Sequence, residues 1–245
     1  MAGASFPYSS RMIENEIKLC WLGQPPQLPA ILGPALETRT LVNTYFDTPK
    51  RALAAQGYGL RLRQNGAEIE QTLKGPAPHQ DGIVVRQEWN WLRPEFSIDP
   101  SVLPVTVDAL EVVSTNRVSR QVWVIQGCEV VMDQGQVQVG QAASPIAEIE
   151  IEALESDWSG VQAVAKRLAQ EFPCYIGSIS KAERGHLLAG RDSPADQSPL
   201  DGLGRALDTI KGPDWARAES YAAQISPAVL ERIQARDANV AALCL

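Results

Sequence analysis

The sequence predicts an α+β fold in which a mostly antiparallel sheet is followed by helices and a short helical C-terminal extension. The sheet is indicated by short runs of alternating apolar and polar residues, separated by Gly, Pro, Asn and Asp, that fill residues 11–151. Helices are indicated after this stretch, where apolar residues recur at helical spacing. Strands that precede the helices, instead of alternating with them, favour the α+β class.

Each predicted strand is one run of this alternation, bounded by turn residues. The second run ends in Tyr45-Phe46-Asp47-Thr48, interpreted as a strand end followed by a turn because Asp and Thr favour turns. Asp133-Gln134-Gly135 is likewise a natural hairpin turn and divides two later strands. The predicted strands cover residues 12–20, 39–47, 58–64, 67–74, 82–91, 112–125, 128–133, 136–140 and 146–154.

Three helices are predicted around the sheet. Residues 26–36 contain enough Leu, Ile and Ala for a short one. Residues 160–171 form the second, since Val161, Val164 and Leu168 recur on one helical face. The third covers residues 180–189, where Ser180 and Glu183 have the spacing of a capping box.

The C-terminal part has a different composition. Residues 191–200 are polar, contain proline and lack periodicity, so they predict a linker between a first domain, residues 1–190, and an extension, residues 201–245. Within the extension, apolar residues from Leu203 to Ile210 and again beyond Ser226 follow helical spacing. The extension is too small for its own core, so we expect it to pack on the first domain or to be partly mobile.

Composition narrows the function. The 245 residues carry 22 Lys and Arg against 29 Asp and Glu, a net charge of −7, which argues against nucleic acid as a partner. No apolar run could span a membrane, and the N-terminus lacks the layout of a signal peptide, so a cytoplasmic protein with no membrane partner is expected. The four cysteines and two histidines are scattered, which disfavours a zinc site or a disulfide scaffold.

Charged residues cluster by strand. Glu14, Glu16 and Lys18 share one face of the first predicted strand, because side chains two residues apart point the same way. Arg61 and Arg63 share a face of another strand. For any one strand, a solvated face would explain the pattern. Segregation of Arg onto one strand and Glu onto another instead indicates a binding site.

The chemistry of such a site follows from charge repulsion. Clustered carboxylates are stabilised by a hard divalent cation such as Mg²⁺ or Mn²⁺, which takes oxygen ligands. Clustered Arg and Lys are stabilised by a polyanion, and the planar Arg fork matches phosphate oxygens. If the sheet curls so that these faces look inward, it becomes a closed barrel with a charged lumen that binds phosphates together with metal.

The motifs that carry these charges resemble those of a known family. Glu14-x-Glu16-x-Lys18 resembles the ExExK signature of the CYTH, or triphosphate tunnel metalloenzyme, superfamily. The likeness covers about residues 12–190 and is closest to the bacterial inorganic triphosphatases. Its further motifs, in order, are Asn43-Thr44-Tyr45-Phe46-Asp47-Thr48-Pro49, Gly59-Leu60-Arg61-Leu62-Arg63, Gln71-Thr72-Leu73-Lys74, Arg86-Gln87-Glu88, Ser119-Arg120-Gln121-Val122-Trp123, Met132-Asp133-Gln134-Gly135, Ala147-Glu148-Ile149-Glu150-Ile151-Glu152 and Ser178-Ile179-Ser180-Lys181-Ala182.

The resemblance implies an eight-stranded antiparallel tunnel, flanked by helices, that holds triphosphate inside it. It implies that phosphate oxygens are held by Lys18, Arg61, Arg63, Lys74, Arg86, Arg120, Lys181 and Arg184. It implies that Mg²⁺ or Mn²⁺ is held by Glu14, Glu16, Glu88, Glu148 and Glu150, with Asp133 and Glu152 as outer members. The residues that it implicates most directly in catalysis are Lys18, Glu88 and Lys181.

Several of these residues have structural alternatives. Asp133 could be part of the hairpin turn, and Glu152 could face solvent at the barrel mouth. His186 is interpreted as ordinary helix surface. Three tryptophans alternate within strands and are interpreted as packing residues, namely Trp89, Trp91 and Trp123.

The resemblance leaves three functions open. The first is hydrolysis of inorganic triphosphate to diphosphate and phosphate. The second is action on a base-bearing triphosphate, as in thiamine triphosphatases or class IV adenylate cyclases. The third is a polyphosphate-binding module without turnover. Larger bacterial relatives continue into a histidine-rich CHAD domain, whereas this sequence ends at Leu245 with no histidine after His186.

Overall fold

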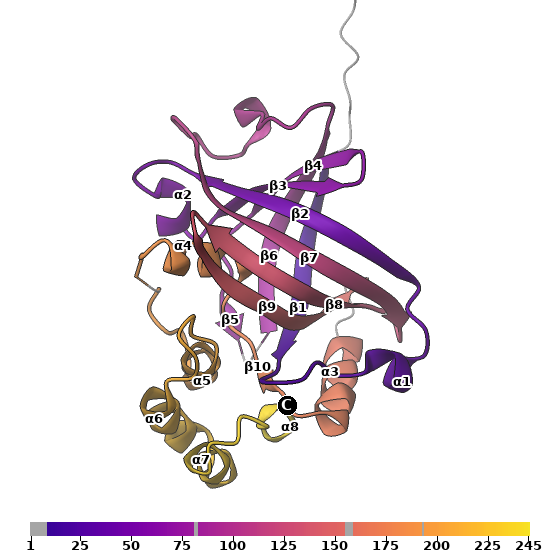
Figure 1. The fold of residues 1–245 in the computed structure, drawn as a ribbon, viewed down its shortest axis with the longest axis vertical. Helices are drawn as coiled ribbons and strands as arrows, with labels where there is room; N and C mark the ends of the chain where they lie inside the picture. Colours follow the sequence, from indigo (N-terminus) through magenta and orange to yellow (C-terminus); the bar gives the residue numbers. More distant parts are fainter. Residues whose placement is uncertain (1–8, 81–82, 155–158, 193) are drawn as a thin grey trace, which may run out of the picture.

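The computed structural model describes residues 9–80, 83–154, 159–192 and 194–245. The N-terminal residues 1–8, Gly82 at the start of one predicted strand, and Ser193 within the predicted linker lie outside these residues. Figure 1 shows a barrel of strands with helices at its lower end and on one side. No helix of the described ranges is long and apolar enough to cross a membrane.

Within the described part of the chain, eight strands close into an antiparallel barrel, as predicted. Their spatial order is β1, β9, β8, β7, β2, β3, β4 and β6, and β6 pairs back onto β1. The strands are β1 (Ser9–Cys20), β2 (Glu37–Asp47), β3 (Gly59–Asn65), β4 (Glu68–Lys74), β6 (Ile83–Arg93), β7 (Glu111–Ile125), β8 (Cys128–Val139) and β9 (Ala142–Ala153). Two short strands pair with the barrel: β5 (His79–Gln80) pairs with β6, and β10 (Tyr175–Ile176) pairs with β1.

The apolar faces of the strands point outward and are covered. On β1, Ile17 and Leu19 are fully buried in a cluster with α3 (Ser159–Glu171). This cluster also includes residues of α1 (Leu28–Leu32) and α8 (Ala241–Cys244). Because these apolar residues face outward, the alternate residues of β1 face the lumen.

A second outer cluster covers β3, β4 and β6. It is formed by α2 (Ala52–Ala55) and by the segment that contains the short helix η1 (Pro100–Val102). Asp47 fixes the turn into α2, because its carboxylate accepts hydrogen bonds from the backbone N–H groups of Thr48, Leu53 and Ala54. Trp89 and Trp91 pack in this cluster, and Trp123 packs in the first, so the three tryptophans are packing residues as expected.

One helix, α4 (Lys181–Leu188), packs against the inward side of β7, β8 and β9. Ser180 caps it by accepting a hydrogen bond from the Glu183 N–H at 3.1 Å, as predicted. Leu188 packs on an apolar cluster of the lumen that includes Val118 and Val137. A Cβ at Gly185 would lie 2.1 Å from Ser114 Oγ, so the absence of a side chain there permits the close approach of α4 to β7.

The C-terminal extension forms α5 (Pro199–Leu207), α6 (Trp215–Ile225) and α7 (Pro227–Gln234). Their apolar residues, such as Leu203 and Ile233, share one cluster with Cys20 of β1 and Tyr175 of β10. The extension therefore completes its core against the barrel, in line with its small size.

The structure differs from the local expectations at three places. Asp133 is not in a turn: β8 is continuous, and Gly135 permits a close strand approach, since a Cβ there would lie 2.0 Å from the Arg117 carbonyl oxygen. The first helix is shorter than predicted because Gly33, with φ of 84°, and Pro34 end it. α6 was missed because its buried residues, Ala218 and Ala222, are small and give a weak apolar signal, although they recur at helical spacing.

Candidate functional site: a charged tunnel

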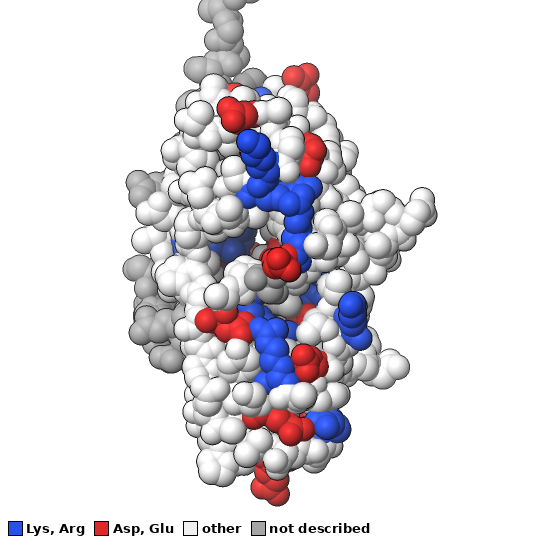
Figure 2. Space-filling model, turned by 90° about the vertical axis from the view of Figure 1, so that its left-hand side faces the viewer, with Lys and Arg blue, Asp and Glu red and all other residues white. Residues whose placement is uncertain are grey.

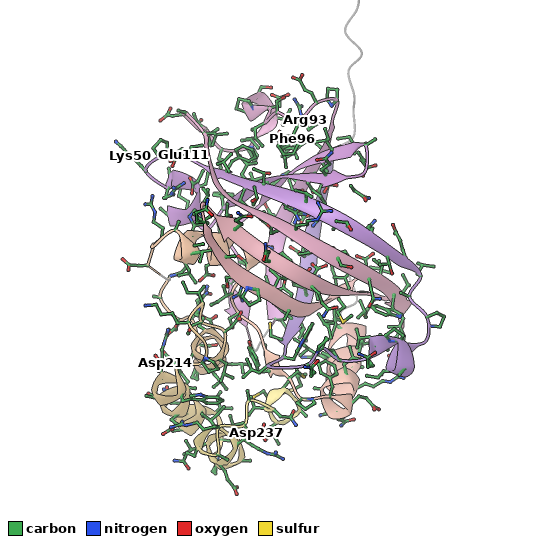
Figure 3. All side chains as sticks on the ribbon, in the orientation of Figure 1. Lys50, Arg93, Phe96, Glu111, Asp214 and Asp237 are labelled. Atoms are coloured by element: carbon green, nitrogen blue, oxygen red, sulfur yellow. The ribbon has the colours of Figure 1, made fainter. Side chains whose placement is uncertain are left out.

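The barrel encloses a cavity of about 890 Å³. Figure 2 shows an opening on the side of the molecule that carries α2 and α4, with basic and acidic side chains around and inside it. Lys50, at the edge of this side, contributes to the lining (Figure 3). Among the described residues that line the cavity, basic side chains outnumber acidic ones, although the chain as a whole is acidic.

Most of the predicted site residues line this cavity. They are Glu14, Lys18, Arg61, Arg63, Lys74, Arg86, Glu88, Arg120, Glu150, Glu152 and Lys181. Glu16, Asp133 and Glu148 are buried and pair with residues of this lining. Arg184 stands apart, because its guanidinium donates to Asp208 at 2.6 Å and to Ser144 at 3.3 Å.

One wall of the tunnel is basic. Arg61 and Arg63 lie on β3, and Arg39 lies opposite Arg120 across the β2–β7 pair. Arg63 Nε donates to Asn43 Oδ1 at 3.0 Å, and Asn43 in turn donates to Asn116 at 2.7 Å. Arg61 Nε is buried and has no hydrogen-bond partner among the described residues.

Within the basic wall, Arg63 has a charge that its surroundings disfavour. Burial, Arg61 and Arg120 together lower the pKa of Arg63, which means that its positive charge is disfavoured where it lies. An arginine remains protonated under ordinary conditions, so this disfavoured charge is relieved by binding an anion. The wall therefore has the properties of an anion site.

The facing wall is acidic and is built by strand register. Glu14 lies opposite Arg86 on β6, Glu16 lies opposite Glu152 on β9, and side chains directly opposite each other share a face. Lys74 donates to Glu14 at 2.6 Å and pairs with Glu88 at 2.8 Å.

Two carboxylates of the acidic wall are poorly neutralised. Burial, together with Glu14 and Glu150, raises the pKa of Glu16 to about 7. Burial and the nearby carboxylates Glu14 and Glu16 raise the pKa of Glu152 to about 8. Glu152 therefore lies within the acidic wall and lines the cavity, instead of simply facing solvent at the mouth.

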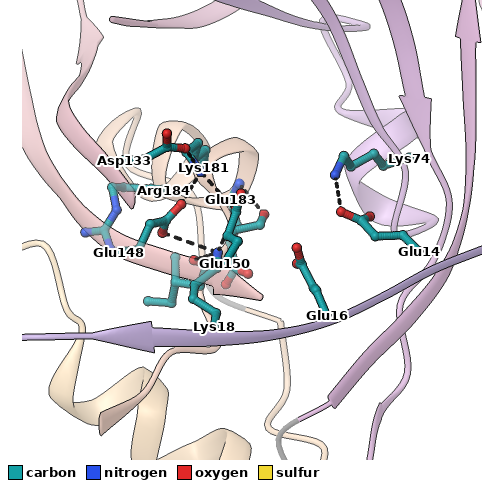
Figure 4. A network of polar contacts seen from close by, with 12 residues as sticks. Glu14, Glu16, Lys18, Lys74, Asp133, Glu148, Glu150, Lys181, Glu183 and Arg184 are labelled. Carbon is teal, nitrogen blue, oxygen red and sulfur yellow. Dashed lines mark hydrogen bonds and ion pairs between the residues drawn. The ribbon is translucent and has the colours of Figure 1, made fainter. Parts of the chain in front are cut away.

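A third group surrounds the start of α4 (Figure 4). Lys181 Nζ lies 2.8 Å from Asp133, 2.9 Å from Glu150 and in hydrogen-bond contact with Glu148. Lys18 pairs with Glu148 at 3.3 Å, and Arg120 makes a two-pronged contact with Asp133 at 2.8 and 2.6 Å. Glu16 points into the space between this group and the Lys74–Glu14 pair (Figure 4).

The donor set fits a hard divalent cation. Carboxylate oxygens are the ligands that Mg²⁺ and Mn²⁺ prefer. Oxygens of Asp133, Glu148 and Glu150 lie within 4.8 Å of one another. These three already pair with lysines, whereas burial and nearby carboxylates disfavour the charged forms of Glu16 and Glu152, which a bound cation would stabilise.

Sequence reasoning missed several lining residues. Arg39 and Tyr45 line the cavity and share a face of β2 with Asn43, a period-two signal that could have found them. His186 lines the cavity and lies 3.8 Å from Asp47, so its interpretation as helix surface was wrong, because that face of α4 turns toward the end of β2. Arg205 of the extension also lines the cavity, and no local pattern indicated it.

The chain thus forms a closed antiparallel barrel, a tunnel whose interior carries opposed basic and acidic walls. A family model for the CYTH domain matches residues 12–186, which is most of the chain. The chain therefore belongs to the CYTH family, and the resemblance drawn from the sequence motifs is confirmed.

Two relatives illustrate this membership. The inorganic triphosphatase of Haemophilus influenzae is 30% identical over 210 residues, which cover 79% of this chain and 57% of the relative. This chain thus spans little more than half the length of that relative. The solved structure of HpAC1 from Hippeastrum superposes with a TM-score of 0.55 at 21% identity, covering 74% of this chain and 98% of that one, and supports the fold.

Proposed function

We propose that this protein hydrolyses inorganic triphosphate to diphosphate and phosphate inside the tunnel, with Mg²⁺ or Mn²⁺ as cofactor. The observation that carries the proposal is that a basic wall and an acidic wall face each other in one cavity. Each wall holds a residue whose charge its surroundings disfavour, Arg63 on the basic wall and Glu16 on the acidic wall. A polyanion with its metal is the ligand that neutralises both walls at once. The similarity to the Haemophilus inorganic triphosphatase supports this substrate.

The basic wall would bind the phosphate chain. Arg61 and Arg63 offer guanidinium forks to phosphate oxygens, and Arg39 and Arg120 extend the same wall. Because the arginines are buried and the Asn43–Asn116 pair fixes Arg63, the site is preorganised for the anion. Lys18 and Lys181 would offset negative charge as it develops on the reacting phosphoryl group.

The acidic wall would hold the metal. Glu16 and Glu152 would supply carboxylates whose charge is disfavoured without a cation. Glu14 and Glu88 lie beside them and pair with Lys74. When bound, the metal neutralises phosphate oxygens and lowers the pKa of a bound water. Glu88 is directed by Lys74 and by Asn90 at 2.9 Å, and we assign it the role of accepting the proton that the attacking water loses. The water oxygen bonds to the terminal phosphorus, and diphosphate leaves with the bridging oxygen.

A base-bearing triphosphate is the second candidate, and one observation favours it. Apolar residues from α2 and from the segment after β4 line part of the cavity, including Ala54, Tyr58 and Pro76. Such a surface could contact a ring attached to the triphosphate. Thiamine triphosphate and ATP are therefore the competitors to test.

The experiment measures phosphate release from inorganic triphosphate, ATP and thiamine triphosphate side by side, with Mg²⁺, Mn²⁺ or EDTA, and includes an assay for cyclic AMP. We expect metal-dependent release that is fastest with inorganic triphosphate. Preference for ATP or thiamine triphosphate would transfer the assignment to the second candidate. Tight triphosphate binding without release from any substrate would indicate a polyphosphate-binding module and refute the proposal.

A further inference from the structure

Helix α4 is held between the tunnel and the C-terminal extension. On the tunnel side, Lys181 contacts Asp133, Glu148 and Glu150. In the same first turn, two further side chains contact α5 and the residue that follows it: Glu183 pairs with Arg205, and Arg184 pairs with Asp208 at 2.6 Å. Figure 4 shows Lys181, Glu183 and Arg184 on this one short helix.

These contacts neutralise charges that are unfavourable where they lie. Lys181 and Arg184 are basic residues in the first turn of α4, where the helix dipole favours negative charge. Arg184 is only 5% exposed, so its charge needs a partner, and Asp208 provides it. An eight-residue helix gains little stability on its own, so its position depends on such tertiary contacts.

Loss of the Asp208 carboxylate would affect the tunnel through Glu148. The Glu148 carboxylate acts electrostatically on Arg184, and Figure 4 shows the Arg184 and Glu148 side chains close together. Glu148 is also the carboxylate that Lys18 and Lys181 share. Without Asp208, Arg184 would compete with both lysines for Glu148.

Arg205 makes a second connection. It is 3% exposed, its Nε donates to Asp201 at 3.0 Å, and its other guanidinium edge contacts Glu183. Both Arg205 and Glu183 line the tunnel cavity. The extension thus reaches the wall of the cavity through a buried ionic network and does more than cover the outside of the barrel.

We propose that Arg205 and Asp208 of the C-terminal extension are positioning residues for the tunnel reaction: they hold α4 so that the Lys181 ammonium faces Asp133, Glu148 and Glu150. The inference rests on the proposed triphosphatase function for its catalytic consequence. Its structural part, that the extension fixes α4, is independent of that function.

The test compares Asp208→Asn with a matched control, Asp214→Asn. Asp214 lies in the same extension, where its side chain caps α6 and does not contact α4 (Figure 3). The control substitution removes the same charge. We expect Asp208→Asn to lower kcat on triphosphate by roughly 10- to 100-fold, as for removal of a residue that orients a functional group. KM should change less than kcat, because Arg39 lies on β2 and Arg61 and Arg63 lie on β3, outside α4. Asp208→Glu should restore much of kcat, and Asp214→Asn should leave it unchanged.

Hydrogen exchange of peptides from residues 181–188 supplies a readout that does not require activity. We expect faster exchange in Asp208→Asn than in the wild type or in Asp214→Asn. If Asp208→Asn does not fold, Arg205→Lys is used instead, because it keeps the buried charge but loses the planar guanidinium. The same decrease in kcat and the same faster exchange are expected from it.

Unchanged exchange in α4 would overturn the proposal. A wild-type chain without triphosphatase activity but with this exchange result would refute the proposed function and retain the structural inference. Equal losses of kcat in Asp208→Asn and Asp214→Asn would refute positioning.

Discussion

Replacement of Gly185 by alanine tests whether α4 is tightly fixed against the barrel, because two physical effects predict opposite signs. Helix propensity alone favours alanine over glycine by about 1 kcal/mol. The new Cβ, however, would lie 2.1 Å from Ser114 Oγ and 2.7 Å from Ser114 Cβ. The hydroxyl can rotate away, but Cβ is attached to β7, so either α4 or the strand must move.

The steric effect should dominate. Overpacking of this kind typically costs about 1–3 kcal/mol, which exceeds the gain in propensity. For a chain of this size each kcal/mol corresponds to about 2–4 °C in Tm, so a decrease of several degrees is expected. Because Lys181 lies one helical turn before Gly185, kcat on triphosphate should also fall.

Thermal and urea unfolding of Gly185→Ala, Ser114→Gly and the double variant measure the effect. Ser114 Oγ has no hydrogen bond among the described residues, so Ser114→Gly opens space without breaking one. The double variant should therefore recover part of the lost stability, with a coupling energy of about 1 kcal/mol or more. An unchanged or increased Tm for Gly185→Ala, with no coupling to Ser114→Gly, would show that α4 is loosely placed and would refute this reasoning.

Further predictions address the walls and the extension. Arg61→Ala removes a charged contact worth about 1.5–3 kcal/mol, so KM for triphosphate should rise by roughly 10-fold or more, with a smaller change in kcat. Unchanged KM and kcat would show that Arg61 does not bind the phosphate chain. Glu148→Gln removes the carboxylate that Lys18 and Lys181 share, so metal-dependent turnover should be lost while circular dichroism shows a folded barrel, and near-normal activity would show that the reaction does not need this carboxylate. EDTA should stop phosphate release and added Mg²⁺ or Mn²⁺ should restore it, whereas turnover that persists in EDTA would exclude the metal. Gly202→Ala places a Cβ 2.4 Å from the Tyr221 ring, so a lower Tm is expected from calorimetry, and no change would mean that α5 and α6 pack loosely.

The barrel interior was predictable because strands have a period of two. Glu14, Glu16 and Lys18 could be placed on one face from the sequence alone, and the register then brings Glu152 and Arg86 opposite them. The outward packing of the alternate apolar residues confirms the orientation. Local pattern therefore predicted which side chains face the lumen, and family motifs predicted how the strands close.

What the sequence could not show depends on contacts between distant residues. Asp133 was interpreted as a possible turn residue because the following Gly135 is locally ambiguous, whereas the structure uses that glycine for close strand approach. Arg205 and Asp208 contact α4 across more than twenty residues of sequence, and the helix that carries Arg205 follows an expected linker. Tertiary pairing of this kind leaves no periodic signal.

The most direct test of the central claim is the initial rate of triphosphate hydrolysis by the wild-type chain and by Glu16→Gln, each stripped of metal and then supplied with Mg²⁺ or Mn²⁺. The account predicts equal amounts of diphosphate and phosphate from the wild type. It predicts a rate lower by roughly 100-fold in the folded variant, because a metal-binding carboxylate is lost. A Glu16→Gln rate close to that of the wild type, or hydrolysis that does not depend on metal, would contradict the account.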